Sequence, residues 1–413
     1  MSMKAPYQGW VEIDLDALDQ NIATLKQHSG GARIAAVVKA NAYGHGALAI
    51  AQASMQAGAD RVCTYNLDEA AELRAFGFQD PILVLGQIFP DDAARAVDLN
   101  VALTISQSET AAAVAAEAKR RGRRVPVHVK VEAGLNRLGL PRDTAADFAD
   151  AVRRTEGLAL EGFYTHFPSA DGPLPEDGLS PSDTEQRFER FLTIARETDA
   201  PILHAANTAS LLRFPSMALD MVRIGVGLYG ISPGAEADSA FSADALGLAP
   251  VLTWKAMLIR VHDVAAGESV SYGATWMAER DSRVGVVAVG YADGFRRALS
   301  NRGSMLVRGM RVPVVGTICM DMCMVDLTDL AGADVGDEAT LVGVDGAERT
   351  TLEDVAVLCD TIPHEMSTAI GDRPARVYLR GGQPVAVQTK LDQQPIPTTA
   401  PTPRAAVVAA GGR

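Results

Sequence analysis

Between residue 30 and about residue 230, short runs of β-branched and other apolar residues alternate with stretches rich in Ala, Glu and Arg. Those stretches, such as GALAIAQASMQAGA and ETAAAVAAEAKRRG, predict helices, with Gly where a helix would close. Eight strands separated by helices indicate an α/β fold, a (β/α)8 TIM-type barrel, because a doubly wound sheet usually has fewer strands. The predicted strands are 33–40, 61–66, 81–86, 101–106, 125–132, 160–166, 202–207 and 221–230.

The pattern changes after about residue 240, where runs such as VLTWKAMLIRVHDV and SRVGVVAVGYAD follow one another with short Gly, Pro and Asp turns. This pattern predicts a second, mostly antiparallel β domain over 241–381, after a barrel domain over 1–240. The early run WVEIDLD (10–16) is expected to be a strand that joins the C-terminal sheet. The segment 382–413 is rich in Pro, Thr and Ala without periodicity, and we expect it to be a disordered tail.

The composition excludes several classes of function. A net charge of −13 argues against nucleic acid and against anionic membrane surfaces as partners. No apolar run reaches the length of a membrane span or forms a signal core, so a cytoplasmic location is expected. The four cysteines indicate reduced thiols. Cys319 and Cys323 are four residues apart, but no second pair or nearby histidine completes a metal site, so no metal is expected.

Unusual polar residues stand at the carboxyl ends of the predicted barrel strands, where such barrels place their active sites. The first is Lys39, one of only seven lysines, which ends the apolar run AAVVK. It could extend from a sheet edge into solvent, or it could be held partly dry to act as a base or a Schiff-base former. A single histidine here could equally be a core residue, but several cationic groups meeting at one end favour an active site. The others in or after the strands are Lys130, Glu132, Arg137, His166, His204, Asn207 and Arg223.

Two further segments are suited to phosphate. HAANTAS supplies the Thr208 hydroxyl and free amides after the seventh strand, and RIGVG supplies glycine amides after the eighth. Phosphate sites of these barrels form where those two loops meet. A phosphorylated ligand facing a lysine at a strand end suggests pyridoxal 5′-phosphate (PLP), with the phosphate as anchor and the lysine as covalent attachment point.

These segments resemble the successive motifs of bacterial alanine racemases. The resemblance runs in order from about residue 9 to residue 380, and KANAYGHG and SYGATW are its most specific parts. It implies a fold-type III PLP enzyme that interconverts L-alanine and D-alanine, acts as a homodimer with shared active sites, and supplies D-alanine for peptidoglycan. The other matching segments are VKVEAGLNRLG, YTHF, HAANTA, VRIGVGLYG, GESVSYGATWMA, GYADGFRR and GTICMDMCMVD.

The resemblance also implies roles for individual residues. Lys39 would bind PLP and serve one face of the substrate Cα, and Tyr272 of the other subunit would serve the opposite face. His166 and Arg223 would support them, with the arginine at the pyridine nitrogen. Arg137 and the Met320 backbone amide would bind the substrate carboxylate. The implied cofactor-binding set is Lys39, Tyr43, His166, Asn207, Thr208, Arg223, Gly225 and Val226.

Four more positions follow from the resemblance. Lys130 matches a lysine that can be carbamylated. Tyr291, Thr317 and His364 are assigned to the substrate channel. The family often has arginine where this chain has Thr317 and usually has tyrosine where it has His364, so a wider or differently polar channel is expected here.

There are three alternatives, and the sequence argues against the first two. A metal-dependent barrel hydrolase would need a His-x-His pair on an early strand and a ligand aspartate on the eighth, and the chain offers neither. A non-catalytic PLP carrier would lack the second domain. A broader-specificity or serine-directed racemase of the same fold stays open.

Overall fold

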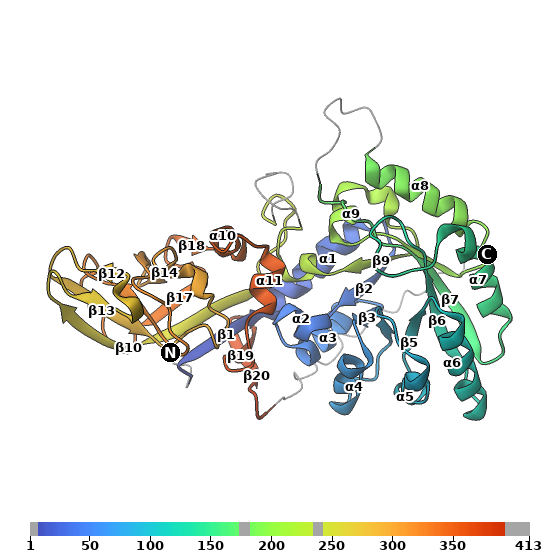
Figure 1. The fold of residues 1–413 in the computed structure, drawn as a ribbon, viewed down its shortest axis with the longest axis horizontal. Coiled ribbons are helices and arrows are strands. Elements are labelled where there is room, and N and C mark those ends of the chain that lie inside the picture. The colour runs from blue at the N-terminus through green and yellow to red at the C-terminus, as the bar shows by residue number, and fades with distance from the viewer. Residues whose placement is uncertain (1–6, 173–181, 234–242, 393–413) are drawn as a thin grey trace, which may run out of the picture.

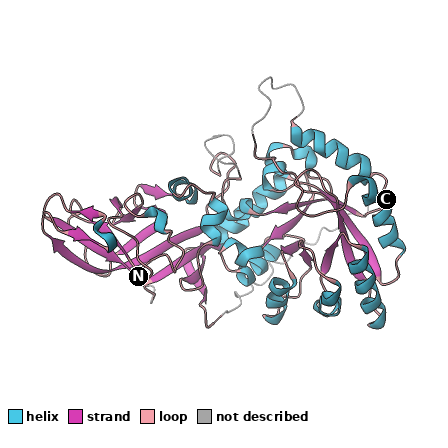
Figure 2. Cartoon of the chain, viewed as in Figure 1, coloured by secondary structure: helices cyan, strands magenta, loops and turns pink. Residues whose placement is uncertain are grey.

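A computed structural model of the protein describes residues 7–172, 182–233 and 243–392. The chain has two parts that lie end to end, a barrel ringed by helices and a domain built mainly of strands (Figures 1 and 2). Among the described residues, no helix is both long enough and apolar enough to cross a membrane.

The first part is an eight-stranded parallel sheet in the order β8-β7-β6-β5-β4-β3-β2-β9. Between β8 and β9 two backbone hydrogen bonds, Asp220 N to Leu203 O and Arg223 N to Ala206 O, bring the sheet edges together. This arrangement confirms the predicted (β/α)8 barrel. The strands are β2 (Arg33–Val37), β3 (Arg61–Thr64), β4 (Ile82–Val84), β5 (Ala102–Ile105), β6 (Val125–Lys130), β7 (Leu158–Tyr164), β8 (Ile202–His204) and β9 (Met221–Ile224).

Seven helices follow the strands along the chain, and the helix α1 (Leu15–His28), which precedes the barrel, contacts α3 and the segment after β9. Asn21 of α1 is fully buried, and its side chain bonds to Leu228 O at 3.0 Å and to both backbone groups of Ala249. The helices are α3 (Ala47–Gln56), α4 (Leu67–Ala75), α5 (Ala93–Leu99), α6 (Ser108–Arg120), α7 (Arg142–Arg154), α8 (Asp183–Ala195) and α9 (Thr208–Arg213).

The barrel strands end earlier than the sequence predicts, and the correction falls on site residues. Lys39 and His166 each lie two residues beyond a strand, and Glu132 lies two residues beyond β6. Asn207 caps α9, with its side chain accepting from Ser210 N at 2.9 Å. The apolar runs suggested longer strands, but at this end the backbone leaves the sheet to form the turns that shape the site.

The second part is a ten-stranded sheet, antiparallel except where β1 (Gly9–Asp14) runs parallel to β19 (Ala375–Arg380). β1 also pairs with β10 (Leu252–Val264), so the N-terminal strand lies inside the C-terminal sheet. Two short helices, α10 (Leu352–Leu358) and α11 (Pro363–Thr368), belong to this part. The remaining strands of the sheet are β13 (Ser282–Val287), β14 (Ser304–Val307), β15 (Met310–Pro313), β16 (Cys323–Asp326), β17 (Glu338–Asp345), β18 (Glu348–Thr350) and β20 (Gln383–Gln388).

β20 corrects the expectation of a disordered tail over 382–413. Gly381 and Gly382 both adopt positive φ angles, and they turn the chain so that β20 pairs antiparallel with β19. The alternating pattern of QPVAVQ fits such a strand, but the Pro-rich sequence around it obscured the signal. Residues 393–413 of the predicted tail lie outside the described residues.

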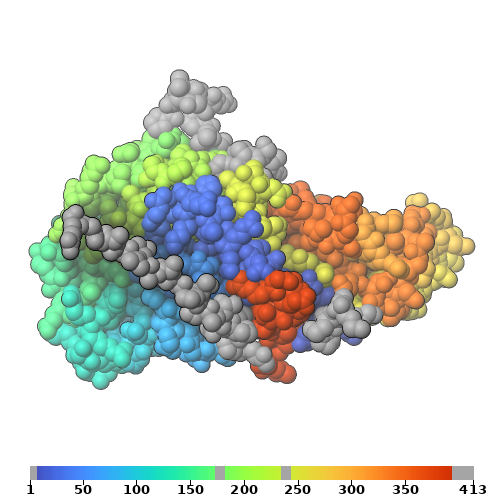
Figure 3. Space-filling model, turned by 180° about the vertical axis from the view of Figure 1, so that it is seen from behind, coloured from blue at the N-terminus to red at the C-terminus, as the bar shows by residue number. Residues whose placement is uncertain are grey.

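The two parts are joined by polar contacts as well as by the chain. Arg380 at the end of β19 donates to Leu15 O at 3.0 Å and contacts the carboxylates of Asp16 and Asp19 on α1. Seen from behind, α1 lies on the surface between the barrel and the segment that contains β19 and β20 (Figure 3).

Candidate active site

Lys39 opens a turn with an unusual backbone. Ala40, Asn41, Ala42 and Tyr43 all have φ close to +52°, so the short element α2 (Lys39–Tyr43) contains a left-handed turn made of non-glycine residues. Such a conformation is unfavourable by about 1–2 kcal/mol per residue, because Cβ approaches the following carbonyl oxygen. The turn therefore needs contacts from the surrounding structure to hold it.

Residues from other elements provide those contacts. Ala40 N donates to the Glu69 carboxylate of α4 at 2.8 Å. Arg376 of β19 is 2% exposed and donates from Nε and Nη2 to Gly44 O. The Tyr378 hydroxyl, also from β19, donates to His45 O at 3.1 Å. The C-terminal domain thus holds the segment that follows Lys39.

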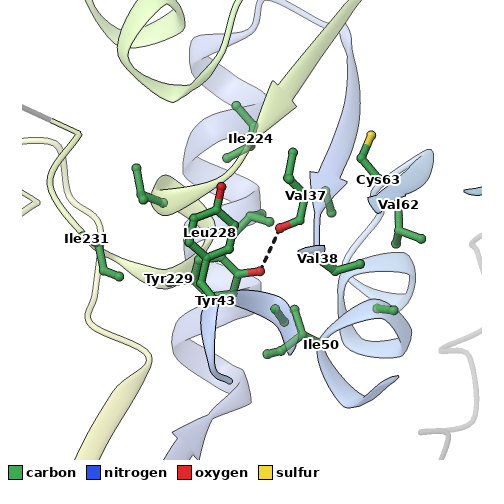
Figure 4. Close-up of a cluster of buried hydrophobic side chains, with 14 of the residues drawn as sticks. Val37, Val38, Tyr43, Ile50, Val62, Cys63, Ile224, Leu228, Tyr229 and Ile231 are labelled. Atoms are coloured by element: carbon green, nitrogen blue, oxygen red, sulfur yellow. Dashed lines mark hydrogen bonds between the residues drawn. The ribbon is translucent and has the colours of Figure 1, made fainter. Parts of the chain in front are cut away.

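Aromatic rings support the turn from the barrel side. The Tyr229 hydroxyl donates to Val37 O at 2.9 Å, which fixes the last residue of β2, and its ring lies 5.1 Å from that of Tyr43 (Figure 4). The His45 ring also stacks on Tyr229, with the two ring centroids 4.3 Å apart. Burial lowers the pKa of His45 to about 4, so its imidazole is neutral.

Five cationic or imidazole groups meet at the carboxyl ends of the strands, as the sequence predicts. Burial first, and then the positive charges of Arg223, Lys130, Arg137 and Lys39, hold the pKa of His166 well below its usual value. Burial and Arg137 likewise lower the pKa of Lys39. The site therefore favours a neutral amine and a neutral imidazole, the forms that can accept protons.

Lys130 is 6% exposed and has no carboxylate ion partner among the described residues. Its ammonium lies 5.8 Å from the Tyr164 ring, and burial with Arg223 and Arg137 lowers its pKa to about 8. Glu132, in the loop after β6, accepts hydrogen bonds from Gly134 N and Arg137 N and so shapes the loop that carries Arg137.

Arg223 is buried at the bottom of this cluster. Its Nη2 donates to Thr165 O at 2.7 Å and to Ala205 O at 3.0 Å, and it lies 3.3 Å from His166 Nδ1. Its Nη1 lies 2.9 Å from His204 Nδ1. The guanidinium is therefore fixed by neutral acceptors rather than by a carboxylate.

The two loops predicted for phosphate do come together. Thr208 Oγ1 accepts from Gly225 N and from Gly227 N, both at 3.3 Å, and so ties the start of α9 to the segment after β9. A Cβ atom on Gly225 would lie 2.7 Å from the Tyr43 hydroxyl oxygen, so glycine leaves space there. Val226 begins the 3-10 helix after β9, beside these groups. Hydroxyls and first-turn N–H groups surround this space, a set of donors suited to an anion.

Tyr272 lies in the C-terminal domain, in a short turn directly before β12 (Trp276–Met277). β12 is at the end of the molecule that is remote from α2 (Figure 1). Its side chain is 73% exposed, yet the turn that carries it is well fixed. Thr317 Oγ1 donates to Tyr272 O at 2.9 Å, Ser271 Oγ donates to Thr317 O, and Asn301 donates to Thr275 Oγ1. Thr317 is thus buried beneath the tyrosine that it supports.

The other predicted site residues divide between the two regions. Tyr291 and Met320 are exposed and lie on adjoining segments, since Tyr291 N donates to Cys319 O at 3.1 Å. Both are near Tyr272, because Cys319 Sγ lies 3.6 Å from the hydroxyl of Ser271. His364 of α11 lies instead over α2, with its ring centroid 6.1 Å from that of Tyr43. Among the described residues of one chain, no hydrogen bond or ion pair joins Lys39 to Tyr272.

Sequence reasoning missed the residues that hold the site without facing it. Arg376 and Tyr378 are buried polar residues of the strand ARVYLR, where they alternate with apolar residues. Glu69 had no signal, because it is one of three acidic residues in the short helix α4.

Family comparisons divide the chain where the structure does. Residues 13–233 match the model of the alanine racemase N-terminal domain, and residues 251–378 match that of the C-terminal domain. The chain belongs to the alanine racemase family. The family resemblance expected from the motifs is thereby confirmed, and with it the expectation of an isomerase.

Individual racemases agree over most of their length. The chain is 40% identical to the alanine racemase of Desulforamulus reducens, over 91% of this chain and 100% of that protein. The crystal structure of the Bacillus anthracis alanine racemase with bound L-Ala-P has a TM-score of 0.84 at 34% identity, covering 94% and 99% of the two chains. The alanine racemase of a D-cycloserine-producing Streptomyces lavendulae has a TM-score of 0.83 at 34% identity, covering 91% and 98%.

Proposed function

We propose that the protein is a cytoplasmic, PLP-dependent alanine racemase that acts as a homodimer and supplies D-alanine for peptidoglycan. One observation carries the proposal. Lys39, with a lowered pKa, lies at the same end of the barrel as the donor groups around Thr208 and Gly225, while Tyr272 stands exposed on a fixed turn in the other domain.

The residues at the barrel mouth fit PLP. Tyr43, Thr208, Gly225 and Val226 would hold its phosphate, in the space that glycine leaves below the tyrosine hydroxyl. Arg223 would donate to its pyridine nitrogen, and Lys39 would bind it covalently. When bound, PLP would withdraw electron density from the substrate Cα and so acidify the Cα proton.

The reaction needs one base on each face of Cα, because a single base tends to return the proton to the face it left. Lys39 Nζ would move the proton on one face, since its lowered pKa makes the neutral amine accessible at lower pH. The Tyr272 hydroxyl of a second copy would move the proton on the opposite face. Tyr272 of the same chain belongs to the other domain, which supports a dimer with shared sites.

Other residues would bind and orient. Arg137 and the Met320 backbone N–H would hold the substrate carboxylate, and His166 would remain a neutral partner of Arg223. Asn207 would act through the cap of α9. Lys130 would be carbamylated, because a pKa of about 8 leaves roughly a tenth of the amine neutral and reactive at pH 7, far more than for an ordinary lysine. The resulting anion would face Arg137.

A broader-specificity or serine-directed racemase is the second candidate. His364 stands where relatives usually carry tyrosine, and its Nδ1 is buried without a hydrogen-bond partner among the described residues. A shorter ring at that point leaves more room beside Tyr43.

The test is a racemisation assay of the purified, PLP-supplied protein over a panel of L- and D-amino acids, with borohydride reduction and peptide mapping to locate the cofactor. We expect fastest turnover of alanine in both directions and PLP fixed on Lys39. A protein that binds no PLP, or carries it on Lys130, would contradict the proposal.

A further inference from the structure

A chain of polar side chains, buried except for the last one, leads away from Arg223 through the barrel interior. Arg223 Nη1 lies 2.9 Å from His204 Nδ1, and His204 Nε2 lies 2.8 Å from His128 Nδ1. His128 Nε2 in turn lies 2.7 Å from Glu161 Oε2. We call these four residues, Arg223, His204, His128 and Glu161, the histidine chain. Both histidines have no exposed surface.

Glu161 also pairs with a cation, the guanidinium of Arg61. Arg61, the first residue of β3, donates to both of its carboxylate oxygens, at 2.8 and 3.0 Å. Burial alone would raise the pKa of Glu161, but hydrogen bonds from His128 and Arg61 outweigh it and hold the pKa well below its usual value. Glu161 is therefore an ionised carboxylate that can only accept.

The two ends of the histidine chain fix its direction. Arg223 has N–H donors and no acceptor, so His204 must turn the lone pair of Nδ1 toward it. At the other end His128 Nε2 lies 2.7 Å from Glu161 Oε2 and 3.2 Å from Arg61 Nη1. Arg61 Nη1 donates to the carboxylate at the shorter distance of 2.8 Å, so the close contact between Nε2 and an oxygen that only accepts requires a proton on His128 Nε2. Each neutral imidazole has one donor and one acceptor, so both rings are required to be Nε2–H tautomers, with His204 donating to His128. Burial, with neighbouring cations, lowers the pKa of both histidines and keeps them neutral.

Two local features of the backbone build this arrangement. Val127 pairs with Leu160 but His128 pairs with Gly162, so Glu161 is the extra residue of a β-bulge in β7. A bulge redirects a side chain, and here it accompanies the contact between Glu161 and His128. A Cβ atom on Gly162 would lie 2.2 Å from His128 Nδ1, so only glycine leaves room for the ring.

We propose that Glu161 is a positioning residue for the active site: it sets the tautomers of His128 and His204 and thereby fixes the orientation of the Arg223 guanidinium. The tautomers follow from the hydrogen-bond geometry alone. Only the consequence for turnover depends on the proposed racemase function, in which Arg223 contacts the cofactor.

The test compares Glu161→Gln with the full-length protein, with PLP added to both. Nitrogen NMR of ring-labelled histidine reads the tautomers directly, with signals assigned through His128→Asn and His204→Asn. We expect both rings to be Nε2–H in the unmodified protein and at least one to change in Glu161→Gln, whose amide can donate. We also expect kcat to fall roughly 10- to 100-fold, as for loss of one charge-assisted hydrogen bond, with little change in KM.

Glu156→Gln is the matched control, because Glu156 precedes the same strand but is exposed and pairs with Lys119. It should change neither the tautomers nor kcat. If Glu161→Gln does not fold, Gly162→Ala keeps the carboxylate but displaces His128, and it should shift the ring signals and lower kcat.

A proton on Nδ1 of either histidine in the unmodified protein would overturn the proposal. So would unchanged tautomers and kcat in a folded Glu161→Gln or Gly162→Ala protein, or an equal loss of kcat in Glu156→Gln. Absence of racemisation in the unmodified protein would refute the proposed function instead, while the NMR result would still decide the tautomers.

Discussion

Arg376 donates two hydrogen bonds to Gly44 O, at 3.1 and 3.0 Å, although the two residues belong to different domains. The same guanidinium donates to the carbonyl oxygens of Ile370, Gly371 and Pro374 and has no carboxylate partner among the described residues. A buried cation solvated only by carbonyls ties the left-handed turn after Lys39 to the C-terminal sheet. The conformation of the turn after Lys39 and the packing of the two domains therefore depend on one side chain.

Replacing Arg376 with lysine should lower the free energy of unfolding by roughly 2–4 kcal/mol, because lysine cannot satisfy all four carbonyls at once. Urea denaturation followed by circular dichroism measures this difference. Arg373→Lys is the control, since Arg373 is half exposed and pairs with two carboxylates, those of the buried Asp293 and the exposed Asp321. Equal losses in the two variants would show that the carbonyl contacts of Arg376 do not stabilise the fold.

Gly46→Ala should destabilise the protein far more than Gly77→Ala, although both glycines have positive φ. A Cβ atom on Gly46 would lie 1.8 Å from the Tyr378 hydroxyl oxygen, whereas Gly77 has open space around it. We expect about 1 kcal/mol from backbone strain at Gly77 and roughly 3–5 kcal/mol at Gly46, measured as changes in the free energy of unfolding. Adding Tyr378→Phe to Gly46→Ala should recover part of the loss; no recovery would place the clash elsewhere.

Tyr272→Phe should impair proton removal from L-alanine far more than from D-alanine. In the proposed mechanism the Tyr272 hydroxyl accepts the Cα proton of L-alanine, and phenylalanine has no hydroxyl to do so. Solvent-deuterium incorporation, measured separately from each enantiomer, reads the two directions. Equal losses would indicate one shared base.

Mixing Lys39→Ala and Tyr272→Phe subunits should restore activity, because one site of the mixed dimer would keep both bases. Neither parent protein alone should recover on the same treatment. Failure of a verified mixed dimer to regain activity would mean that Tyr272 does not act across the interface.

Stability should fall as the pH drops from about 6.5 to about 4, in part because His45 is buried as a neutral ring. Its folded pKa of about 4 is lower than the unfolded value of 6.5, so the unfolded state binds more protons in this window and gains relative stability. The shift corresponds to about 3 kcal/mol. Urea denaturation at several pH values should show a shallower slope for His45→Gln than for the unmodified protein. An equal slope would assign the effect to the other buried histidines.

His364→Tyr should reduce kcat/KM for serine more than for alanine, by up to about tenfold, because a larger ring beside Tyr43 leaves less room for a substrate side chain. In the unmodified protein we expect alanine to be preferred with measurable turnover of serine. Adding Thr317→Arg should strengthen the preference.

Thr317 requires its own control, because its hydroxyl supports Tyr272 O and a substitution can move Tyr272. Thr317→Val removes that hydrogen bond without adding bulk. Should His364→Tyr lower kcat/KM for both substrates equally, the position governs cofactor binding or stability rather than specificity.

Much of the fold could be read from the sequence, because parallel strands buried on both faces are continuous apolar runs with helices between them. Lys39, Arg223 and Thr208 stood out for the same reason, as polar residues at the ends of those runs. The strand ends were set too late because apolar residues continue past the point where the backbone leaves the sheet. The left-handed turn after Lys39 had no local signal, since Ala40 and Ala42 do not favour it.

The supporting contacts could not be predicted, because they join residues far apart in the chain. Glu161 meets Arg61 across the barrel, and Arg376 meets Gly44 across the domain boundary. Such pairs depend on the register of strands and on a β-bulge, neither of which periodicity reveals. The placement of Tyr272 depends on a second copy of the chain, and this remains a prediction.

β1 is made first but pairs last. Within the sheet, Trp10 pairs with Lys255 of β10 on one side and with Ala375 of β19 on the other. Both partners are more than 240 residues later in the sequence, so neither has been synthesised when β1 leaves the ribosome. At about 5–20 residues per second, the second partner emerges on the order of tens of seconds later. During that interval the barrel can close while β1, which precedes it in the chain, stays unpaired and exposes its apolar side chains. Slow translation or lack of a holdase chaperone should therefore favour aggregation through β1.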